Sequence, residues 1–161
     1  MAQGDMFLKI ESAKQGPIKG EAQDDEHQDE IDVLSWSWGM QARTPLSGAG
    51  ASPKASLDEL KIVKKVDSAS TGLMSAMRNN DEIKKAVLTV RKSGETPLEH
   101  FIITIEKGRI TALEVDSSSF SSTSELSETL SLAFQKIGVQ YVPQGEDGLP
   151  RGAMLFETEI T

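Results

Sequence analysis

Short segments in which apolar and polar residues alternate recur along nearly the whole chain, and they restrict the fold more than any other feature. Successive side chains of a strand point to opposite faces, so this alternation predicts β-strands. The most informative segment is residues 30–40. One of its faces is large and apolar, and we expect it to lie in a core: Leu34, Trp36, Trp38 and Met40. The other face changes midway from aliphatic to small polar residues, as if the strand passes into a second environment: Ile31, Val33, Ser35, Ser37 and Gly39.

Alternation and turn residues predict further strands at residues 5–10, 60–66, 83–92, 97–106, 109–115, 126–142 and 153–160. Lys107 and Gly108 are expected to form the turn between two of them. In the segment 126–142 the apolar residues occupy even positions up to Phe134 and odd positions from Ile137. One extra residue near positions 136–138, a β-bulge, would keep both sets facing inward. Bulges of this kind let a sheet coil into a closed barrel.

One helix interrupts the strands. Asp and Ser side chains at residues 67–70 can cap free backbone N–H groups at its start, and Asn79 and Asn80 can end it. Leu73, Met74 and Met77 form its apolar stripe. Residues 41–56 are rich in Gly, Ala, Ser and Pro, and such a long loop usually has a function. The predicted fold is mainly β: an antiparallel β-barrel with one short α-helix and a long extended loop.

Length and charge narrow the possible functions. The 161 residues suit a single domain, residues 1–161. A net charge of −8 repels phosphate backbones, so we expect no nucleic-acid partner. The absence of cysteine rules out disulfides and thiolate metal sites. Residues 1–10 lack the pattern of a signal peptide, and no run is long enough to span a membrane. We therefore expect no membrane insertion, a start in the cytoplasm, and any export to proceed without a cleaved leader.

A search for catalytic chemistry finds little. His27 lies in the acidic run 23–30, which is interpreted as a solvated loop, because adjacent side chains diverge and do not converge on a metal. His100 alternates with Leu98 and Ile102 and is expected to be partly buried and hydrogen-bonded. No Gly-x-Ser-x-Gly elbow accompanies either histidine. We therefore predict no catalytic, cofactor-binding or metal-binding residue, and no enzymatic activity.

Apolar residues on both faces of several strands point instead to assembly. Ile103 and Ile105 share one face of their strand, while Leu98 and Ile102 share the other. The outer face of an isolated soluble barrel would be mostly polar. We therefore expect neighbouring subunits to cover part of this surface.

Three blocks of residues resemble one family. Asp-Met-Phe-Leu-Lys-Ile at 5–10, Lys-Gly-Glu-Ala at 19–22 with Asp24 and His27, and Glu-Ile-Asp-Val-Leu-Ser-Trp-Ser-Trp-Gly at 30–39 resemble the Hcp (haemolysin-coregulated) proteins. The likeness continues through Lys64, Asp67 and Ser70 and covers nearly the whole chain. Ala22 stands where Ser is frequent, and Thr-Gly at 71–72 replaces a frequent Ser-Pro pair. Gly suits the first helical turn less well than Pro.

The resemblance implies a protomer of hexameric rings that stack into the inner tube of the type VI secretion machine. Its implied partners are further copies, the VgrG-type spike, the sheath, and effector proteins carried in the lumen. Ser35 and Ser37 are then expected to face the lumen and contact cargo. The ring-stacking loop is expected to comprise Leu46, Ser47, Gly48, Ala49, Gly50, Ala51 and Ser52.

Two other classes of function remain open at this point. The chain could be a monomeric β-barrel that binds a small molecule or polysaccharide between Trp36 and Trp38. It could also be a hydrolase that uses His100 or His27. Core packing of two tryptophans on one face is the commoner arrangement, because each buries a large area. Ring-shaped particles in solution would separate the first reading from both alternatives.

Overall fold

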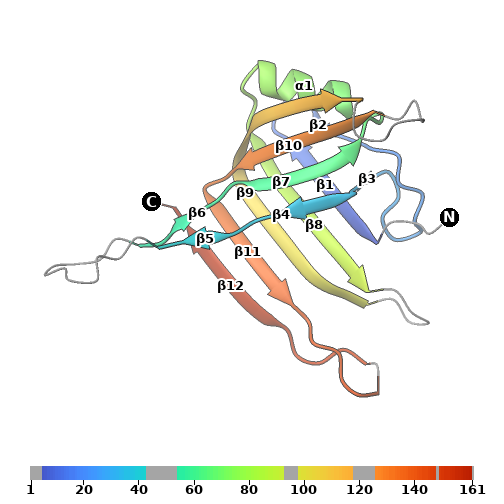
Figure 1. Cartoon of the computed structure of the whole chain (residues 1–161), viewed down its shortest axis with the longest axis vertical. Helices are drawn as coiled ribbons and strands as arrows, with labels where there is room; N and C mark the ends of the chain where they lie inside the picture. Colours follow the sequence, from blue (N-terminus) through green and yellow to red (C-terminus); the bar gives the residue numbers. More distant parts are fainter. Residues whose placement is uncertain (1–4, 43–53, 93–97, 118–125, 148, 161) are drawn as a thin grey trace, which may run out of the picture.

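A computed structural model describes residues 5–42, 54–92, 98–117, 126–147 and 149–160 (Figure 1). Antiparallel strands dominate it, and one helix lies across one end of the curved sheet. The elements are β1 (Met6–Ser12), β2 (Gly16–Pro17), β3 (Ile31–Asp32), β4 (Ser35–Ser37), β5 (Met40–Gln41), β6 (Ser56–Leu57), β7 (Leu60–Lys65), α1 (Ser70–Arg78), β8 (Ile83–Lys92), β9 (Leu98–Asp116), β10 (Ser127–Ala133), β11 (Lys136–Tyr141) and β12 (Met154–Glu159). No described helix is long and apolar enough to pass through a bilayer.

The long strand β9 organises the sheet, because its two halves belong to different ladders. The first half pairs with β8 and β11, and the second half pairs with β10. The ladder continues from β8 to β1 on one side and from β10 through β7 to β4 on the other. The two ladders curve around a common core, which gives the barrel-like shape in Figure 1.

The predicted turn at Lys107 and Gly108 is wrong, because both residues lie within the continuous strand β9. Lys107 has a φ of 54°, and its neighbour Gly108 approaches the opposite strand closely. A Cβ on Gly108 would lie 2.7 Å from the carbonyl oxygen of Ala133. The pair therefore forms a kink within a continuous strand, where β9 changes from one set of partners to the other.

The parity change in residues 126–142 is confirmed, but a break replaces the expected bulge at 136–138. β10 ends at Ala133 and β11 begins at Lys136. Between them, the backbone N–H of Gln135 faces the carbonyl oxygens of Glu106 and Lys107 at 3.3 and 3.2 Å. Leu130, Leu132 and Phe134 of the even set and Ile137 of the odd set are buried, whereas Leu126 and Tyr141, at the two ends of the segment, are 43% and 44% exposed. The break thus turns each half of the segment inward against a different half of β9.

The prediction for residues 30–40 assigned the wrong face to the core at its two ends. Ile31 and Val33 are buried, whereas Leu34 and Met40 are 46% and 48% exposed. The segment is not one strand, because β3 pairs with β1 and β4 pairs with β7. Alternation restarts where the chain crosses from one ladder to the other, so residues before and after Val33 follow different parities. The expected passage between two environments is confirmed.

The helix α1 begins and ends as expected, but its buried face differs. Ser70, Leu73 and Ala76 are buried, while Met74 is 39% exposed. The start is supported by Asp67, whose carboxylate accepts a hydrogen bond from the N–H of Ala69 at 3.0 Å. Residues at intervals of three share one side of a helix, so the inward face follows Leu73 and its neighbours one turn away. Met74 belongs to the outer side.

The core lies between the two ladders and beneath α1. It is built from aliphatic residues of β1, β7, β8, β9, β10 and β11. Leu88, Ile103 and Ile105 are fully buried; across the β8–β9 ladder Leu88 lies opposite Ile103, and Ala86 lies opposite Ile105. Each such side chain contributes roughly 1.5–3 kcal/mol by leaving water. The outer residues Val87 and Ile102 remain half-buried, so the opposite face of these strands is partly apolar as expected.

Candidate functional site

Strand β12 forms an uncovered apolar edge. Met154, Leu155 and Phe156 are 65%, 62% and 41% exposed, although the first and third point to one face and the second to the other. β11 is the strand that pairs with β12, and no described strand lies on its other side. That side therefore offers unpaired backbone N–H and C=O groups next to apolar side chains. Such an edge readily pairs with another chain.

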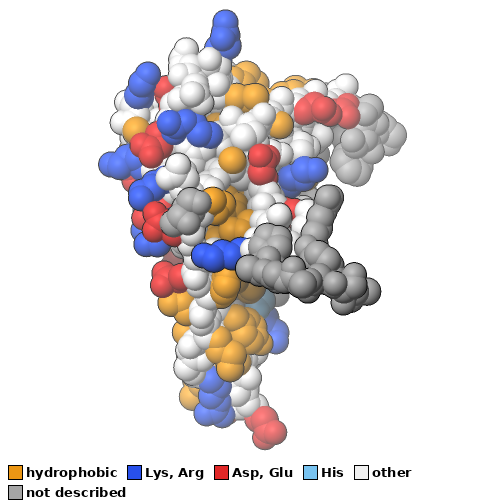
Figure 2. Space-filling view, turned by 90° about the vertical axis from the view of Figure 1, so that its left-hand side faces the viewer, with side chains coloured by type: hydrophobic (Ala, Val, Ile, Leu, Met, Phe, Trp, Pro, Cys, Tyr) orange, Lys and Arg blue, Asp and Glu red, His pale blue; other side chains and the backbone are white. Residues whose placement is uncertain are grey.

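The apolar surface continues from β12 onto β11. Tyr141 pairs with Met154 and is 44% exposed, and Ile160, just after β12, is 52% exposed. Figure 2 shows hydrophobic side chains gathered over the lower part of the molecule, where β11 and β12 lie in Figure 1. We call the exposed set Tyr141, Met154, Leu155, Phe156 and Ile160 the β12 patch. Exposed apolar side chains gathered on an edge strand are typical of an interaction site.

The second open edge is β4, at the far end of the other ladder. β4 pairs with β7, with Ser35 opposite Val63 and Ser37 opposite Lys61. Both serines are exposed. Because β4 and β12 share no ladder, the barrel is not closed by hydrogen bonds among the described residues. The expected closed barrel is therefore open among the described residues: β2 and β4 end the main strand order, and β12 ends the branch through β11.

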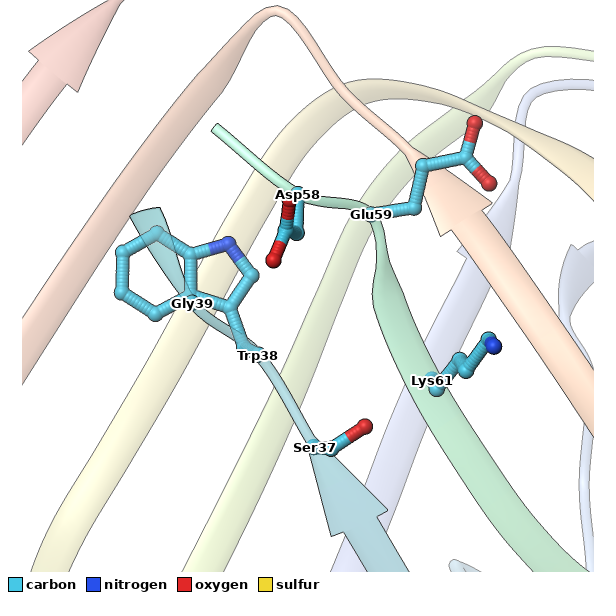
Figure 3. Close-up of a pocket in the computed structure, with 6 residues that line it drawn as sticks. All are labelled: Ser37, Trp38, Gly39, Asp58, Glu59 and Lys61. Carbon is cyan, nitrogen blue, oxygen red and sulfur yellow. The ribbon is translucent and has the colours of Figure 1, made fainter. Parts of the chain in front are cut away.

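A hollow of about 400 Å³ lies beside β4 and is shown in Figure 3. Ser37, Trp38 and Gly39 form one wall, and the segment from Asp58 to Lys61 forms the other. The walls are joined where the N–H of Asp58 donates to the carbonyl oxygen of Gly39 at 2.9 Å. Glu59 accepts a 2.6 Å hydrogen bond from the hydroxyl of Thr111 on β9. A hydroxyl, an amine and two carboxylates thus line one shallow depression, which suits contact with a polar protein surface.

The two tryptophans do not form a ligand box. Trp36 is half-buried and stacks on Phe101 of β9, with 5.5 Å between ring centroids and 17° between planes. Trp38 is also half-buried and packs against the core, and its buried indole N–H has no described hydrogen-bond partner. The indole nitrogen lies on the side of Asp58 in Figure 3.

The structure overturns the interpretation of His27 as a solvated residue. Its side chain is buried and stacks on Phe7, with ring centroids 4.4 Å apart and an interplanar angle of 8°. Nε2 lies 2.7 Å from a carboxylate oxygen of Glu99, and Nδ1 lies 3.0 Å from one of Glu30. Burial opposes a charge on the imidazole, but the two carboxylates outweigh it and raise the pKa of His27 above 6.5. Sequence reasoning missed this because Glu99 is 72 residues away.

Arg91 holds the other side of this cluster. Its guanidinium lies over Phe7, 5.1 Å from the ring centroid, and donates to both carboxylate oxygens of Asp24 at 3.0 and 2.6 Å. These hydrogen bonds lower the pKa of Asp24 to about 2. A second carboxylate, that of Asp5, lies 3.5 Å from the same guanidinium. The acidic segment is therefore attached to the sheet at two points, through Arg91 and through His27.

A buried ion pair is a second feature that sequence reasoning missed. Lys64 of β7 and Glu128 of β10 are both fully buried and contact each other beneath the start of α1. The ammonium also lies 2.9 Å from Asp67, and the Ser70 hydroxyl donates to Glu128 at 3.1 Å. A signal was present, since Lys64 has the same parity as the inward-facing Ile62 in an alternating strand. An inward lysine requires a buried partner.

His100 is partly buried as predicted, but its buried Nδ1 lacks a hydrogen-bond partner among the described residues. Residues 46–52, which are predicted to stack rings, lie outside the described residues. The two short strands that precede and follow this segment, β5 and β6, pair with each other (Figure 1). Ser35 and Ser37 lie together on β4, close to this two-stranded ladder in the chain.

The fold defines a class of protein: a mainly antiparallel β protein with an open sheet and an exposed apolar edge strand, β12. Comparison with known proteins specifies the family. Residues 7–141 match the family described as type VI secretion system effector, Hcp. Protein hcp1 of Pseudomonas aeruginosa is 35% identical over 151 residues, which cover 92% of this chain and 89% of that protein. The chain therefore belongs to the Hcp family of type VI secretion proteins.

Solved structures agree with this assignment. The chain is similar to a type VI secretion system effector from Yersinia pestis, with 27% identity, a TM-score of 0.75, and coverage of 97% of this chain and 100% of that one. It is also similar to Hcp2 from Salmonella typhimurium, with 28% identity, a TM-score of 0.70, and coverage of 97% and 95%. The predicted family and the mainly antiparallel β fold with one helix are thus confirmed.

Proposed function

We propose that this chain is the structural subunit of the type VI secretion inner tube and has no catalytic role. Six copies close into a ring, and rings stack into a tube that carries effector proteins in its lumen. The observation that carries this proposal is the β12 patch, which leaves both faces of an edge strand apolar and uncovered. A head-to-tail contact between two different edges of the same protein closes into a ring when the rotation per subunit divides the circle.

In this proposal β12 forms one half of the contact between neighbours in the ring. Burying Met154, Leu155 and Phe156 at a neighbour would remove apolar surface from water, worth about 25 cal/mol per Å² before the costs of association. Pairing of the free edge with an exposed strand of the next copy would add backbone hydrogen bonds. Apolar burial and backbone hydrogen bonding both involve β12. A single substitution in β12 should therefore separate rings into protomers.

The ring proposal is tested by Leu155→Glu, with native mass spectrometry and negative-stain imaging as readouts. The wild type should form particles of six 17.5 kDa chains, and the variant should remain a folded protomer. Met74→Glu is the matched control, since Met74 is also exposed but lies on α1. A wild type that stays a single 17.5 kDa particle at high concentration contradicts the proposal, as does a Leu155→Glu protein that still forms rings.

Ser35 and Ser37 are proposed to face the lumen and contact cargo. Both are small and exposed, and the hollow next to Ser37 contains charges of both signs (Figure 3). Short polar side chains leave room for a folded passenger, and mixed charges favour weak contacts with many partners. Replacing Ser37 with Gln should leave the rings intact and reduce the amount of effector that co-purifies with them. Unfolding of this variant would instead show that the hydroxyl is needed for packing.

Stacking of rings is assigned to residues 46–52, and the spike and sheath are the further partners. Rings and stacks form in the bacterial cytoplasm, and the tube then leaves the cell with its cargo. Deletion of residues 48–52 should leave single rings but shorten or abolish tubes in electron micrographs. Tubes of unchanged length would refute this assignment. The β5–β6 ladder, which lies before and after the segment, is kept in this deletion.

A further inference from the structure

The cluster around His27 contains more negative charge than its own residues neutralise. Carboxylates of Glu30 and Glu99 face the two ring nitrogens at 3.0 and 2.7 Å. A third, from Glu26, joins them: one ligand atom each of Glu26, His27 and Glu99 lies within 4.8 Å of the other two. One imidazole can supply at most one positive charge to these three carboxylates. The arrangement therefore favours an additional cation.

The nearest described guanidinium does not meet this need. Arg91 lies opposite Glu99 in the β8–β9 register, but its N–H groups are directed at Asp24 and Asp5. Asp24 takes two of these hydrogen bonds and Asp5 a weaker third at 3.5 Å. Two carboxylates already exceed the single positive charge of Arg91, so its guanidinium does not neutralise Glu26 or Glu99.

The imidazole is held as a metal ligand would be. Stacking on Phe7 and burial fix the plane of the ring. Nδ1 is buried, makes no well-aligned hydrogen bond and lies next to Glu30, while Nε2 points toward Glu99. In metal sites the second ring nitrogen of a histidine usually faces a carboxylate, which sets the tautomer and the orientation of the ring. Glu30 occupies that position here.

We propose that His27, Glu26 and Glu99 bind a divalent transition-metal ion, with Zn²⁺ as the best match and Glu30 as the positioning residue. Imidazole nitrogen and carboxylate oxygen are both ligands that zinc accepts, and a water in the fourth position would complete a tetrahedral set. Mg²⁺ and Ca²⁺ prefer oxygen ligands alone. The ion clamps the segment from residue 22 to 30 onto the first residues of β9. This site lies outside the proposed tube function.

The ligand atoms can adopt zinc geometry with small movements. Zinc bonds of about 2.0–2.1 Å place tetrahedral ligands about 3.3 Å apart. The Nε2–Glu99 separation of 2.7 Å must therefore widen slightly, and the longest separation, at most 4.8 Å, must shorten. Glu26 is exposed and the Glu99 side chain is 33% exposed, so rotation of these two carboxylates suffices. The buried ring need not move; on binding, Nε2 releases its proton to water and coordinates the ion, while the N–H at Nδ1 stays directed at Glu30.

The test is a Zn²⁺ titration of the full chain without a histidine tag, purified in the presence of a chelator and followed by calorimetry. Wild type should bind one ion per chain. Glu99→Gln and Glu26→Gln should each weaken binding at least about tenfold, and Glu30→Gln about 10–100-fold, as expected for a residue that orients a ligand. These positions are at least partly exposed, so the variants should fold. Asp25→Asn, an exposed acidic neighbour, is the matched control and should bind like wild type.

A second readout reports geometry. Co²⁺ in a tetrahedral site of nitrogen and oxygen ligands absorbs visible light, and this absorption should be lost in Glu99→Gln but kept in His100→Asn. Absence of binding at millimolar Zn²⁺ overturns the proposal. Equal weakening by Asp25→Asn and Glu99→Gln also overturns it, because the ion would then bind to diffuse surface charge. Ring formation is measured separately without metal, so failure of either proposal leaves the other standing.

Discussion

Removal of the charge of Glu128 is the sharpest test of how this fold is held together. Lys64 and Glu128 are fully buried, and they connect β7, β10 and the start of α1. Glu128→Gln keeps the shape of the side chain but leaves the ammonium without its closest counter-ion. Breaking a buried pair by removing one partner costs about 3–5 kcal/mol. Asp67 remains 2.9 Å from the ammonium, so we expect the lower end, about 3 kcal/mol.

The loss can be measured by urea unfolding followed through the fluorescence of the two tryptophans. For a chain of this length it corresponds to a fall in Tm of roughly 6–12 °C. Association would add stability, so the protein concentration must be held fixed. Glu106→Gln is the matched control, because Glu106 pairs with Lys136 at 3.7 Å on the partly exposed surface. Such pairs contribute at most about 1 kcal/mol.

The double variant Lys64→Met with Glu128→Leu separates charge from packing. It removes both charges and fills the space with apolar side chains, which is often neutral or stabilising at buried pairs. We expect it to recover most of the stability that Glu128→Gln loses. The reasoning is refuted if Glu128→Gln costs no more than Glu106→Gln, since the ammonium would then be satisfied without the pair.

Three further changes test local features. Gly20→Ala places a Cβ 2.6–2.8 Å from the backbone of Glu30–Ile31, so we expect a loss of about 1–3 kcal/mol; an unchanged melting temperature would contradict this close approach. Leu73→Ala should cost about 2–5 kcal/mol in urea unfolding, whereas alanine at the exposed methionine that follows should cost far less, and equal losses would show that the helix face is misassigned. Asp24 has a pKa of about 2, lowered from 3.8 by Arg91, so its stabilising effect is present above pH 3.8 and is lost as the pH falls toward 2. Asp24→Asn should therefore be less stable than wild type at pH 6 and nearly equal at pH 2, and a difference that persists at pH 2 would exclude this pair as the cause.

The sequence determined the local character of most elements. Alternation located β1, β7, β8 and β12 to within a few residues, because a residue's parity along a strand depends only on its neighbours. The helix was found from its cap and terminating residues for the same reason. The blocks at 5–10 and 30–39 also carried the family resemblance that the comparisons confirm.

Tertiary structure decided which of two faces is covered and which distant groups meet. Alternation shows that Leu34 and Met40 share a parity, but the crossing from one ladder to the other between β3 and β4 leaves both exposed. The burial of His27 and of Lys64 depends on carboxylates that lie 72 and 64 residues away in the chain. A local pattern contains no information on such pairings, because they arise only when the strands assemble into the sheet and bring charges from different elements into one low-dielectric space.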